Sequence, residues 1–424
     1  MRIAFITPEY TSEESYSGGL ANYLGRMATS LAEQGHDVHV FTKSFAANEV
    51  IDYRGVTVHR VIPLWDLKMR IDRIDRLTPR SLYAPYQDLK AAWSLWRRWK
   101  QAHREQRFDV VQVSNVLAVG WFFRKAKDVP IVTRLSSYRP AWDSAVGVEM
   151  TRSVRARWWM EKVAIKRTKH IYSPTQFVAR LTEENYKIPR IDVIETPFFM
   201  EEPKADLSEY ALHCKGKKYI LFFGRMTQMK GVHRLAEALP GLMQRFANMH
   251  AVFVGGQFVA PGGGQMHNYI RQQTDAFRDR VIVLDAMRHD KLYPIIENAD
   301  VVAIPSLIDN LPNTCLEAMA LGRVVVATTG TCFEQLIVDG KSGILVEPDH
   351  TESLSEGLAR AWELSQKQRE EIGSNAMARI KQLSPDIKVP ELIEYFESLN
   401  KKKTKSRNQT SGVSQLSQVT TTTG

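Results

Sequence analysis

The segment PSLIDNLPNTCLEAMALGRVVVAT, residues 305–328, carries the pattern that decides the fold of this chain. The apolar run DVVAIP ends where the segment begins, and a polar loop, a stretch with helical spacing and a second apolar run, RVVVAT, follow in order. Both runs are rich in Val and Ile without polar alternation, which is typical of strands buried on both faces. A strand, a crossover helix and a second strand indicate a parallel α/β sheet.

The same alternation of short apolar runs and amphipathic stretches extends along most of the chain. In the first half the predicted strands are residues 2–8, 37–42, 56–61, 109–114, 131–137, 170–174 and 191–197. In the second half they are residues 219–225, 250–256, 280–286, 300–306, 323–330 and 343–348. A chain of 424 residues is too long for one ordinary hydrophobic core. We therefore predict an α/β protein with two Rossmann-like, doubly wound domains.

Breaks in the pattern place the domain limits. The segment TPFFMEEPKAD, residues 196–206, has two prolines and no clear period. We expect an N-terminal domain over residues 1–200 and a C-terminal domain over residues 201–383, followed by one helix over residues 384–400. The tail, residues 401–424, is almost free of apolar side chains and cannot offset its ordering entropy, so we expect it to be disordered.

Composition narrows the class of protein. Hydrophobic residues make up 44% and charged residues 25%, the balance of a soluble globular protein. No run of about 18 apolar residues is present, and the start of the chain lacks the apolar region of a signal peptide. Three cysteines without CxxC spacing suggest buried thiols in a reducing compartment. We expect a cytoplasmic protein.

The positive charge is concentrated in the first half. Lys and Arg number 31 against 21 Asp and Glu in residues 1–200, 21 against 26 in residues 201–400, and 5 against 0 in residues 401–424. Two basic stretches, residues 89–107 and 151–170, carry tryptophan: Trp93, Trp96 and Trp99 in the first, Trp158 and Trp159 in the second. Such stretches suit an anionic membrane surface on the inner face of the cytoplasmic membrane, unless the aromatics pack inward and the charges form a solvated face. No nucleic-acid-binding module is visible, so we expect no nucleic-acid partner.

One short motif lies at the end of the first strand in each half of the chain. Gly18 and Gly19 open a helix after the first strand, where backbone N–H groups can approach a phosphate or a sugar, although a tight loop also requires glycine. The pair is not GxGxxG, which argues against a dinucleotide-dependent dehydrogenase. In the second half FFGRMTQMKG places Arg225 and Lys230 at a strand end, where two cations can clamp a diphosphate or can be solvated surface charges.

Residues 305–328 contain two carboxylates, Asp309 and Glu317. Asp309 lies in the loop after the strand and can meet sugar hydroxyls, whereas Glu317 lies on the helix and can accept from a ribose diol. The helix begins near Asn313, and its free N–H groups can hold phosphate. The alternative is that Asp309 and Asn313 only cap the helix.

Residues 305–328 and the segment FFGRMTQMKG, together with SGGLANYLGRMATSLAEQGHDVHVFT, resemble the retaining glycosyltransferases of family 4, which have the GT-B fold with two Rossmann-like domains facing a central cleft. The resemblance covers about residues 1–400. It implies that Arg225 and Lys230 grip the donor diphosphate and that the family's Glu-x7-Glu motif falls on Asp309 and Glu317. It further implies that Asp309, Arg225 and Lys230 are the catalytic residues. The donor-binding set that it implies is Gly18, Gly19, Arg225, Lys230, Asp309, Asn310, Leu311, Asn313, Thr314 and Glu317.

The sequence departs from the family pattern at two places. The first acid is Asp309, one methylene shorter than Glu, which bears on the geometry of the donor sugar. Where many relatives have a histidine after the strand IVTRL, this chain has Ser136, an acceptor-side candidate. In this family the donor phosphate itself is thought to take the acceptor proton, so a missing histidine does not abolish the chemistry. The chain has no Asp-x-Asp motif, so we expect neither a metal nor a cofactor.

The predicted function is the transfer of a sugar from a nucleoside diphosphate sugar to a hydroxyl of a glycan or lipid-linked acceptor, with retention of configuration. Two alternatives stay open at this point. One is a nucleotide-sugar epimerase of similar architecture, and the other is a non-catalytic protein that binds nucleotide sugar or glycan. The base, the sugar, the acceptor and the linkage do not follow from the sequence.

Overall fold

The computed structural model describes residues 1–13, 18–63, 78–200 and 204–416, the last sixteen of these by their backbone only. The first sheet has eight strands in the order β3-β4-β2-β1-β5-β6-β7-β8. The strands are β1 (Arg2–Thr7), β2 (Asp37–Lys43), β3 (Val50–Tyr53), β4 (Val56–Val61), β5 (Val110–Ser114), β6 (Ile131–Arg134), β7 (His170–Ser173) and β8 (Asp192–Val193). All neighbours are parallel except β3 and β4, so the predicted doubly wound sheet is confirmed.

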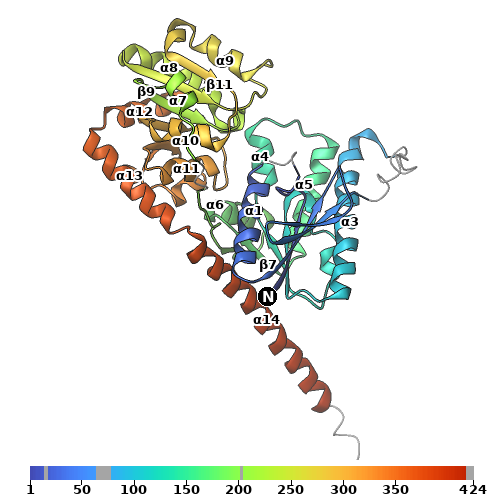
Figure 1. Ribbon diagram of the computed structural model, residues 1–424. Coiled ribbons are helices and arrows are strands. Elements are labelled where there is room, and N and C mark those ends of the chain that lie inside the picture. Colours follow the sequence, from blue (N-terminus) through green and yellow to red (C-terminus); the bar gives the residue numbers. More distant parts are fainter. Residues whose placement is uncertain (14–17, 64–77, 201–203, 417–424) are drawn as a thin grey trace, which may run out of the picture.

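Helices cover both faces of this sheet (Figure 1). They are α1 (Gly19–Glu33), α3 (Tyr83–Glu105), α4 (Arg139–Ala145), α5 (Arg152–Lys166) and α6 (Gln176–Tyr186), with short 3-10 turns η2 (Arg80–Leu82), η3 (Val116–Ala118) and η4 (Phe123–Lys125). On one face Ile3 and Phe5 of β1 pack against α1. On the other face Ala4 and Ile6 of the same strand pack against α3. Successive residues of one strand thus serve two cores, which is why the strands read as continuous apolar runs.

The second sheet has six strands, all parallel, in the order β11-β10-β9-β12-β13-β14. The strands are β9 (Lys218–Phe223), β10 (Met249–Val254), β11 (Val281–Leu284), β12 (Val301–Ile304), β13 (Val325–Thr328) and β14 (Ile344–Val346). The helices and turns are α7 (Ser208–His213), η5 (Gln228–Lys230), α8 (Val232–Arg245), α9 (Met266–Gln273), η6 (Asp275–Arg280), α10 (His289–Glu297), α11 (Asn313–Ala320), η7 (Cys332–Gln335), α12 (Thr351–Glu363) and α13 (Gln366–Lys381). Leu221 and Phe223 of β9 face α10 and α11, whereas Ile220 and Phe222 face α8 and α12. Both domains therefore have the Rossmann-like layering that the sequence predicts.

The last helix, α14 (Pro385–Leu416), returns from the second domain to the first (Figure 1). Val389, Leu392, Phe396 and Leu399 bury one side of it against the same core as α1. The predicted helix over residues 384–400 is therefore longer than expected, since the structure describes it as far as Leu416. Once a helix is nucleated by packing, each added residue gains a backbone hydrogen bond without needing side-chain burial. Residues 417–424 of the predicted tail lie outside the described residues.

Two connections join the domains. The chain passes from β8 to α7 through the predicted limit at residues 200 and 201, and it returns through residues 382–385 into α14. The backbone N–H of Phe198 donates to the carbonyl of Leu383 at 2.7 Å, so the two crossings lie side by side. Between them Glu195 accepts from Arg379 and, at 3.2 Å, from Lys388, which ties the first connection to α13 and α14.

The structure corrects two sequence-based expectations in the first domain. The edge strand β3 was not among the predicted strands, because it is short and partly exposed. The tryptophans of residues 89–107 do not face a membrane, since Trp96 is 9% exposed, Trp99 is 2% exposed and Trp93 packs against Trp96 with ring centroids 4.9 Å apart. Their spacing of three residues turns the rings toward the sheet, where burial of so much apolar area is most favourable. Among the described residues, the helices are too short or too polar to traverse a bilayer.

Candidate active site

Two loops of the second domain meet at the carboxyl ends of neighbouring strands. One joins β9 to α8 and contains FFGRMTQMKG, and the other joins β12 to α11. The backbone N–H of Leu307 donates to the carbonyl of Met229 at 2.9 Å. Gly231 has φ of 68°, and a Cβ there would lie 1.8 Å from the carbonyl oxygen of Pro305. Only glycine allows this approach, so Gly231 sets the distance between the two loops.

This approach brings Lys230 to Asp309. The ammonium of Lys230 forms an ion pair with the Asp309 carboxylate, whose side chain is 11% exposed. The Ser306 hydroxyl donates to the same carboxylate at 3.1 Å, and the backbone N–H of Asn310 donates to its other oxygen at 3.0 Å. The loop carboxylate is therefore held in one orientation, and Lys230 is placed beside it at the mouth of the sheet.

Arg225 is exposed on the same side of the sheet. Its guanidinium lies over the ring of Phe258, 4.9 Å from the centroid. The charge of Arg225 acts on the Glu9 carboxyl of the first domain: burial raises the pKa of Glu9, while a hydrogen bond from the Ala21 N–H and the charge of Arg225 oppose the rise. Arg225 thus faces the first domain across the junction.

The start of α11 lies between these groups. Pro312 occupies the position before the helix, and no side chain caps it within the described residues. The alternative that Asp309 and Asn313 serve as helix caps is therefore wrong. Leu311, with φ of 53°, turns the chain sharply before the helix. The first N–H groups of α11, on Asn313 and Thr314, are left for a ligand, and the positive end of the helix dipole favours an anion there.

Glu317 lies further along α11 and is almost fully buried, at 4% exposed. Burial raises the pKa of Glu317 to about 7, and the charge of Arg26 opposes the rise. The imidazole Nε2 of His289 lies 3.7 Å from one Glu317 oxygen. A carboxyl group whose pKa is near neutrality and which has few fixed partners is suited to accept from neutral hydroxyl groups.

Residues of the first domain reach this site directly. Arg26 on α1 donates to the Asn313 side-chain oxygen at 3.2 Å. Asn310 is held at both ends, because its amide nitrogen donates to the carbonyl of Ser136 at 2.7 Å and its oxygen accepts from the Thr175 hydroxyl at 2.7 Å. The structure therefore brings the acceptor-side candidate Ser136 and the donor-side candidate Asn310 into contact.

Gly18 and Gly19 mark the start of α1. Gly18 is the N-cap residue and has no side chain with which to cap the helix. A Cβ on Gly18 would lie 3.1 Å from a Glu9 oxygen, and a Cβ on Gly19 would meet open space. The Glu9 carboxyl accepts from the N–H of Ala21 and so occupies the anion position at this helix end. The predicted glycine pair does lie at the junction, but a carboxylate of the chain stands where we expected ligand contact.

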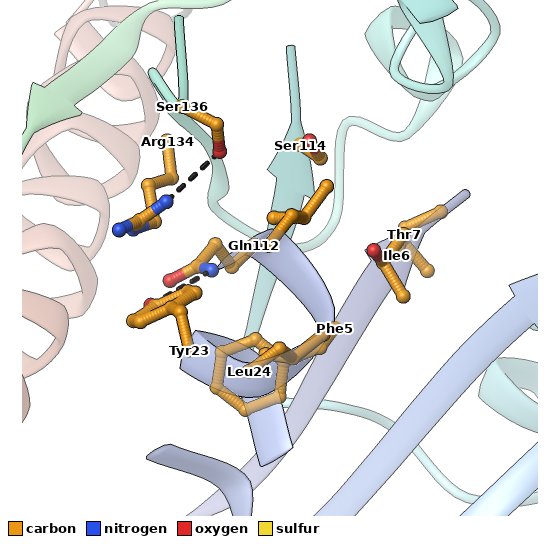
Figure 2. Close-up of a pocket in the computed structure, with 10 residues that line it drawn as sticks. Phe5, Ile6, Thr7, Tyr23, Leu24, Gln112, Ser114, Arg134 and Ser136 are labelled. Carbon is orange, nitrogen blue, oxygen red and sulfur yellow. Dashed lines mark hydrogen bonds between the residues drawn. The ribbon is translucent and has the colours of Figure 1, made fainter. Parts of the chain in front are cut away.

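Ser136 borders a small pocket between α1 and the carboxyl ends of β1, β5 and β6 (Figure 2). The Arg134 guanidinium donates to the Ser136 hydroxyl at 2.9 Å and lies over the Tyr23 ring, 3.5 Å from its centroid. The backbone N–H of Ser136 donates to Asn115 at 2.7 Å. The acceptor-side loop is thus positioned by buried groups behind it, and the Ser136 hydroxyl is already engaged.

Sequence reasoning missed Glu9, Arg26 and Thr175. Glu9 follows the first strand by two residues, so the rule that ligands bind at the carboxyl ends of strands could have indicated it. Arg26 and Thr175 carry no such signal, because their relevance depends on how the two domains meet.

Two doubly wound domains that meet at the carboxyl ends of their strands are the architecture of the GT-B glycosyltransferases. The model described as Glycosyl transferases group 1 matches residues 205–379, and the model described as Glycosyltransferase Family 4 matches residues 17–198. The chain belongs to this family of group 1, family 4 glycosyltransferases.

Curated relatives and solved structures agree with this assignment. An uncharacterized glycosyltransferase of Methanocaldococcus jannaschii is 25% identical over 376 residues, which cover 85% of this chain and 88% of the relative. The D-inositol 3-phosphate glycosyltransferase of Corynebacterium diphtheriae is 24% identical over 372 residues, 82% of this chain and 83% of the relative. Sucrose-phosphate synthase from Thermosynechococcus elongatus shares the fold with a TM-score of 0.73 and 17% identity, covering 94% of this chain and 98% of that chain. HepE of Anabaena in complex with UDP does so with a TM-score of 0.68 and 19% identity, covering 94% and 100%.

Proposed function

We propose that this glycosyltransferase moves a sugar from a nucleoside diphosphate sugar to a hydroxyl of a glycan or lipid-linked acceptor, with retention of anomeric configuration. The observation that carries the proposal is the ion pair of Lys230 with Asp309 beside the uncapped start of α11. It supports the proposal because a cation beside free backbone donors suits a diphosphate, and the adjoining carboxylate suits sugar hydroxyls.

The remaining groups complete a donor site in this proposal. Arg225 provides a second cation for the diphosphate, and Glu317 accepts hydrogen bonds from the ribose diol. The neighbouring structures of HepE include complexes with UDP and with UDP-glucose, which supports a nucleotide-sugar donor for this chain as well. The donor panel described below identifies the base and the sugar that this chain uses.

The proposed reaction breaks the bond between the anomeric carbon and the diphosphate oxygen. The acceptor oxygen forms its bond to the same carbon on the same face, and the acceptor proton passes to a phosphate oxygen of the leaving group. Arg225, Lys230 and the N–H groups of α11 stabilise the charge that develops on the diphosphate. Ser136 lies on the acceptor side, where its carbonyl is held by Asn310.

A panel of nucleoside diphosphate sugars tests the proposal, with each donor incubated alone and with candidate acceptors. We expect release of nucleoside diphosphate that depends on acceptor, and a product whose anomeric configuration, read by NMR coupling constants, is that of the donor. Conversion of the donor sugar without acceptor would instead indicate an epimerase. Binding of a nucleotide sugar without turnover, whichever acceptor is added, would indicate a non-catalytic protein.

Metal independence is a second expected property. Two cations and the helix N–H groups can neutralise the diphosphate, so turnover does not require a divalent ion. We expect unchanged turnover after treatment with a chelator and after addition of magnesium or manganese. Activity that a chelator removes and either ion restores would contradict this prediction.

A further inference from the structure

Large apolar side chains are exposed on three neighbouring segments of the first domain. These segments are the junction of η2 with α3, the loop between α4 and α5, and α5 itself, against which η2 packs. We call the following residues the apolar rim: Leu82, Tyr83, Val146, Val148, Met150 and Trp159, which are 38 to 58% exposed. Exposed apolar side chains gathered in this way mark a binding surface more often than chance.

Helix α5 presents two arginines and a tryptophan together on one exposed face. Arg152, Arg155 and Trp159 recur at spacings of three and four, so they share one face of the helix, and all three are exposed. Arg157 turns inward and forms a two-bond ion pair with Asp88, at 2.7 and 3.0 Å. Within residues 151–170, Arg157 is therefore engaged inside the domain, whereas the exposed face offers Arg152, Arg155 and Trp159 to a partner.

Trp159 is supported from behind. Its ring lies beside that of Trp121, with centroids 5.5 Å apart and planes at 53°. The neighbouring Trp158 is held by its indole N–H, which donates to Asp143 of α4 at 2.7 Å. Trp159 is thus held outward on a packed base, so little side-chain entropy would be lost when it inserts into a partner.

The rim lies on the acceptor side of the first sheet. Helix α4 follows the loop of Ser136 at the carboxyl end of β6, and residues 146–150 and the start of α5 come next, before α5 runs back toward β7. Figure 1 shows α4 at the end of the first domain that is nearer the second. A surface that covers the rim would therefore lie next to the acceptor loop.

We propose that the apolar rim, together with Arg152 and Arg155, docks on an anionic phospholipid surface. Apolar side chains at loop tips, a tryptophan and flanking arginines are the combination that binds the interface of an anionic bilayer. The loop itself contributes one exposed acid, Glu149, against these two cations. The proposal deepens the proposed function in one respect, because docking here would present the acceptor loop to a lipid-linked substrate.

Co-sedimentation of the full chain with vesicles tests the proposal. We expect binding to phosphatidylcholine vesicles that contain phosphatidylglycerol and little binding to phosphatidylcholine alone. Each arginine near an anionic surface contributes about 1 kcal/mol, which is about fivefold in affinity, so Arg152→Glu with Arg155→Glu is expected to weaken binding by about thirtyfold or more. Trp159→Ser is expected to remove the binding that persists at high salt, where the Debye length is only about 3 Å at 1 M.

A matched control lies on α3 of the same domain. Arg97→Glu with Arg98→Glu makes the same change of charge on a helix that buries Trp96 and Trp99, so it is expected to change binding much less. Equal loss from both pairs would overturn the proposal, since it would show a response to net charge alone. No vesicle binding of the unmodified chain at low salt would also overturn it and would favour a protein partner for the rim. Calorimetry with nucleoside diphosphate on the same variants separates a failure of the docking proposal from a failure of the proposed function. Nucleotide binding is expected to be unchanged in these variants, whether or not the rim binds a membrane.

Discussion

Replacing Arg225 or Lys230 by alanine is expected to lower turnover by about a hundredfold or more in each case, with the fold intact. In the proposed mechanism both side chains stabilise the negative charge that develops on the leaving diphosphate in the transition state. Arg225 is exposed and its guanidinium lies over the Phe258 ring, so its removal costs the folded state little. Steady-state rates with a saturating donor, together with a thermal melt, measure both parts of the prediction.

Conservative and remote variants sharpen this test. Arg225→Lys keeps the charge but loses the planar two-bond geometry toward phosphate, so an intermediate rate is expected. Lys341→Ala removes an exposed lysine that lies between η7 and β14, and it is expected to have the normal rate. Rates near normal in both Arg225→Ala and Lys230→Ala would mean that the two cations are surface charges without a role in transfer.

The two carboxylates are expected to have different effects. Glu317→Ala is expected to weaken nucleoside diphosphate binding by about tenfold to a hundredfold, because hydrogen bonds to a charged group contribute about 1.5 to 3 kcal/mol. Asp309→Ala is expected to leave nucleoside diphosphate binding largely intact and to reduce turnover of the whole donor. The ion pair supports this difference, since loss of Asp309 frees Lys230 for the diphosphate. Calorimetry with product nucleotide, beside donor turnover, measures both.

Nucleotide binding through Glu317 is expected to depend on pH. Burial raises the pKa of Glu317 to about 7, so the carboxylate is ionised above that pH and neutral below it. An ionised carboxylate accepts more strongly from ribose hydroxyls, so nucleotide binding is expected to strengthen as pH rises through the pKa. Glu317→Gln is expected to flatten this slope, whereas His289→Ala, which removes the facing imidazole, is expected to keep it. Equal effects of the Asp309 and Glu317 variants on nucleotide binding would contradict the division of roles.

Local pattern was sufficient for the layers of the fold and for the loops that carry the site. Val- and Ile-rich runs such as those of β12 and β13 are buried on both faces, and helices with apolar spacing join them, because each core needs its own face of the strand. The same pattern failed at β3, which has little to bury, and it predicted too short a last helix, because helix propagation does not depend on burial.

What the sequence by itself determined is the class of protein: two doubly wound domains, with Arg225, Lys230 and Asp309 in loops that follow strands and Glu317 on the helix that comes next. Those features depend on periodicity over a few residues, which the chain displays directly. Tertiary structure alone decided which side chains meet at the site. It placed Lys230 against Asp309, Arg26 against Asn313 and Asn310 against Ser136, and it turned Trp96 and Trp99 inward while Trp159 faces outward. These contacts join distant segments, and their geometry depends on how the two sheets and their helices pack, which no local pattern encodes.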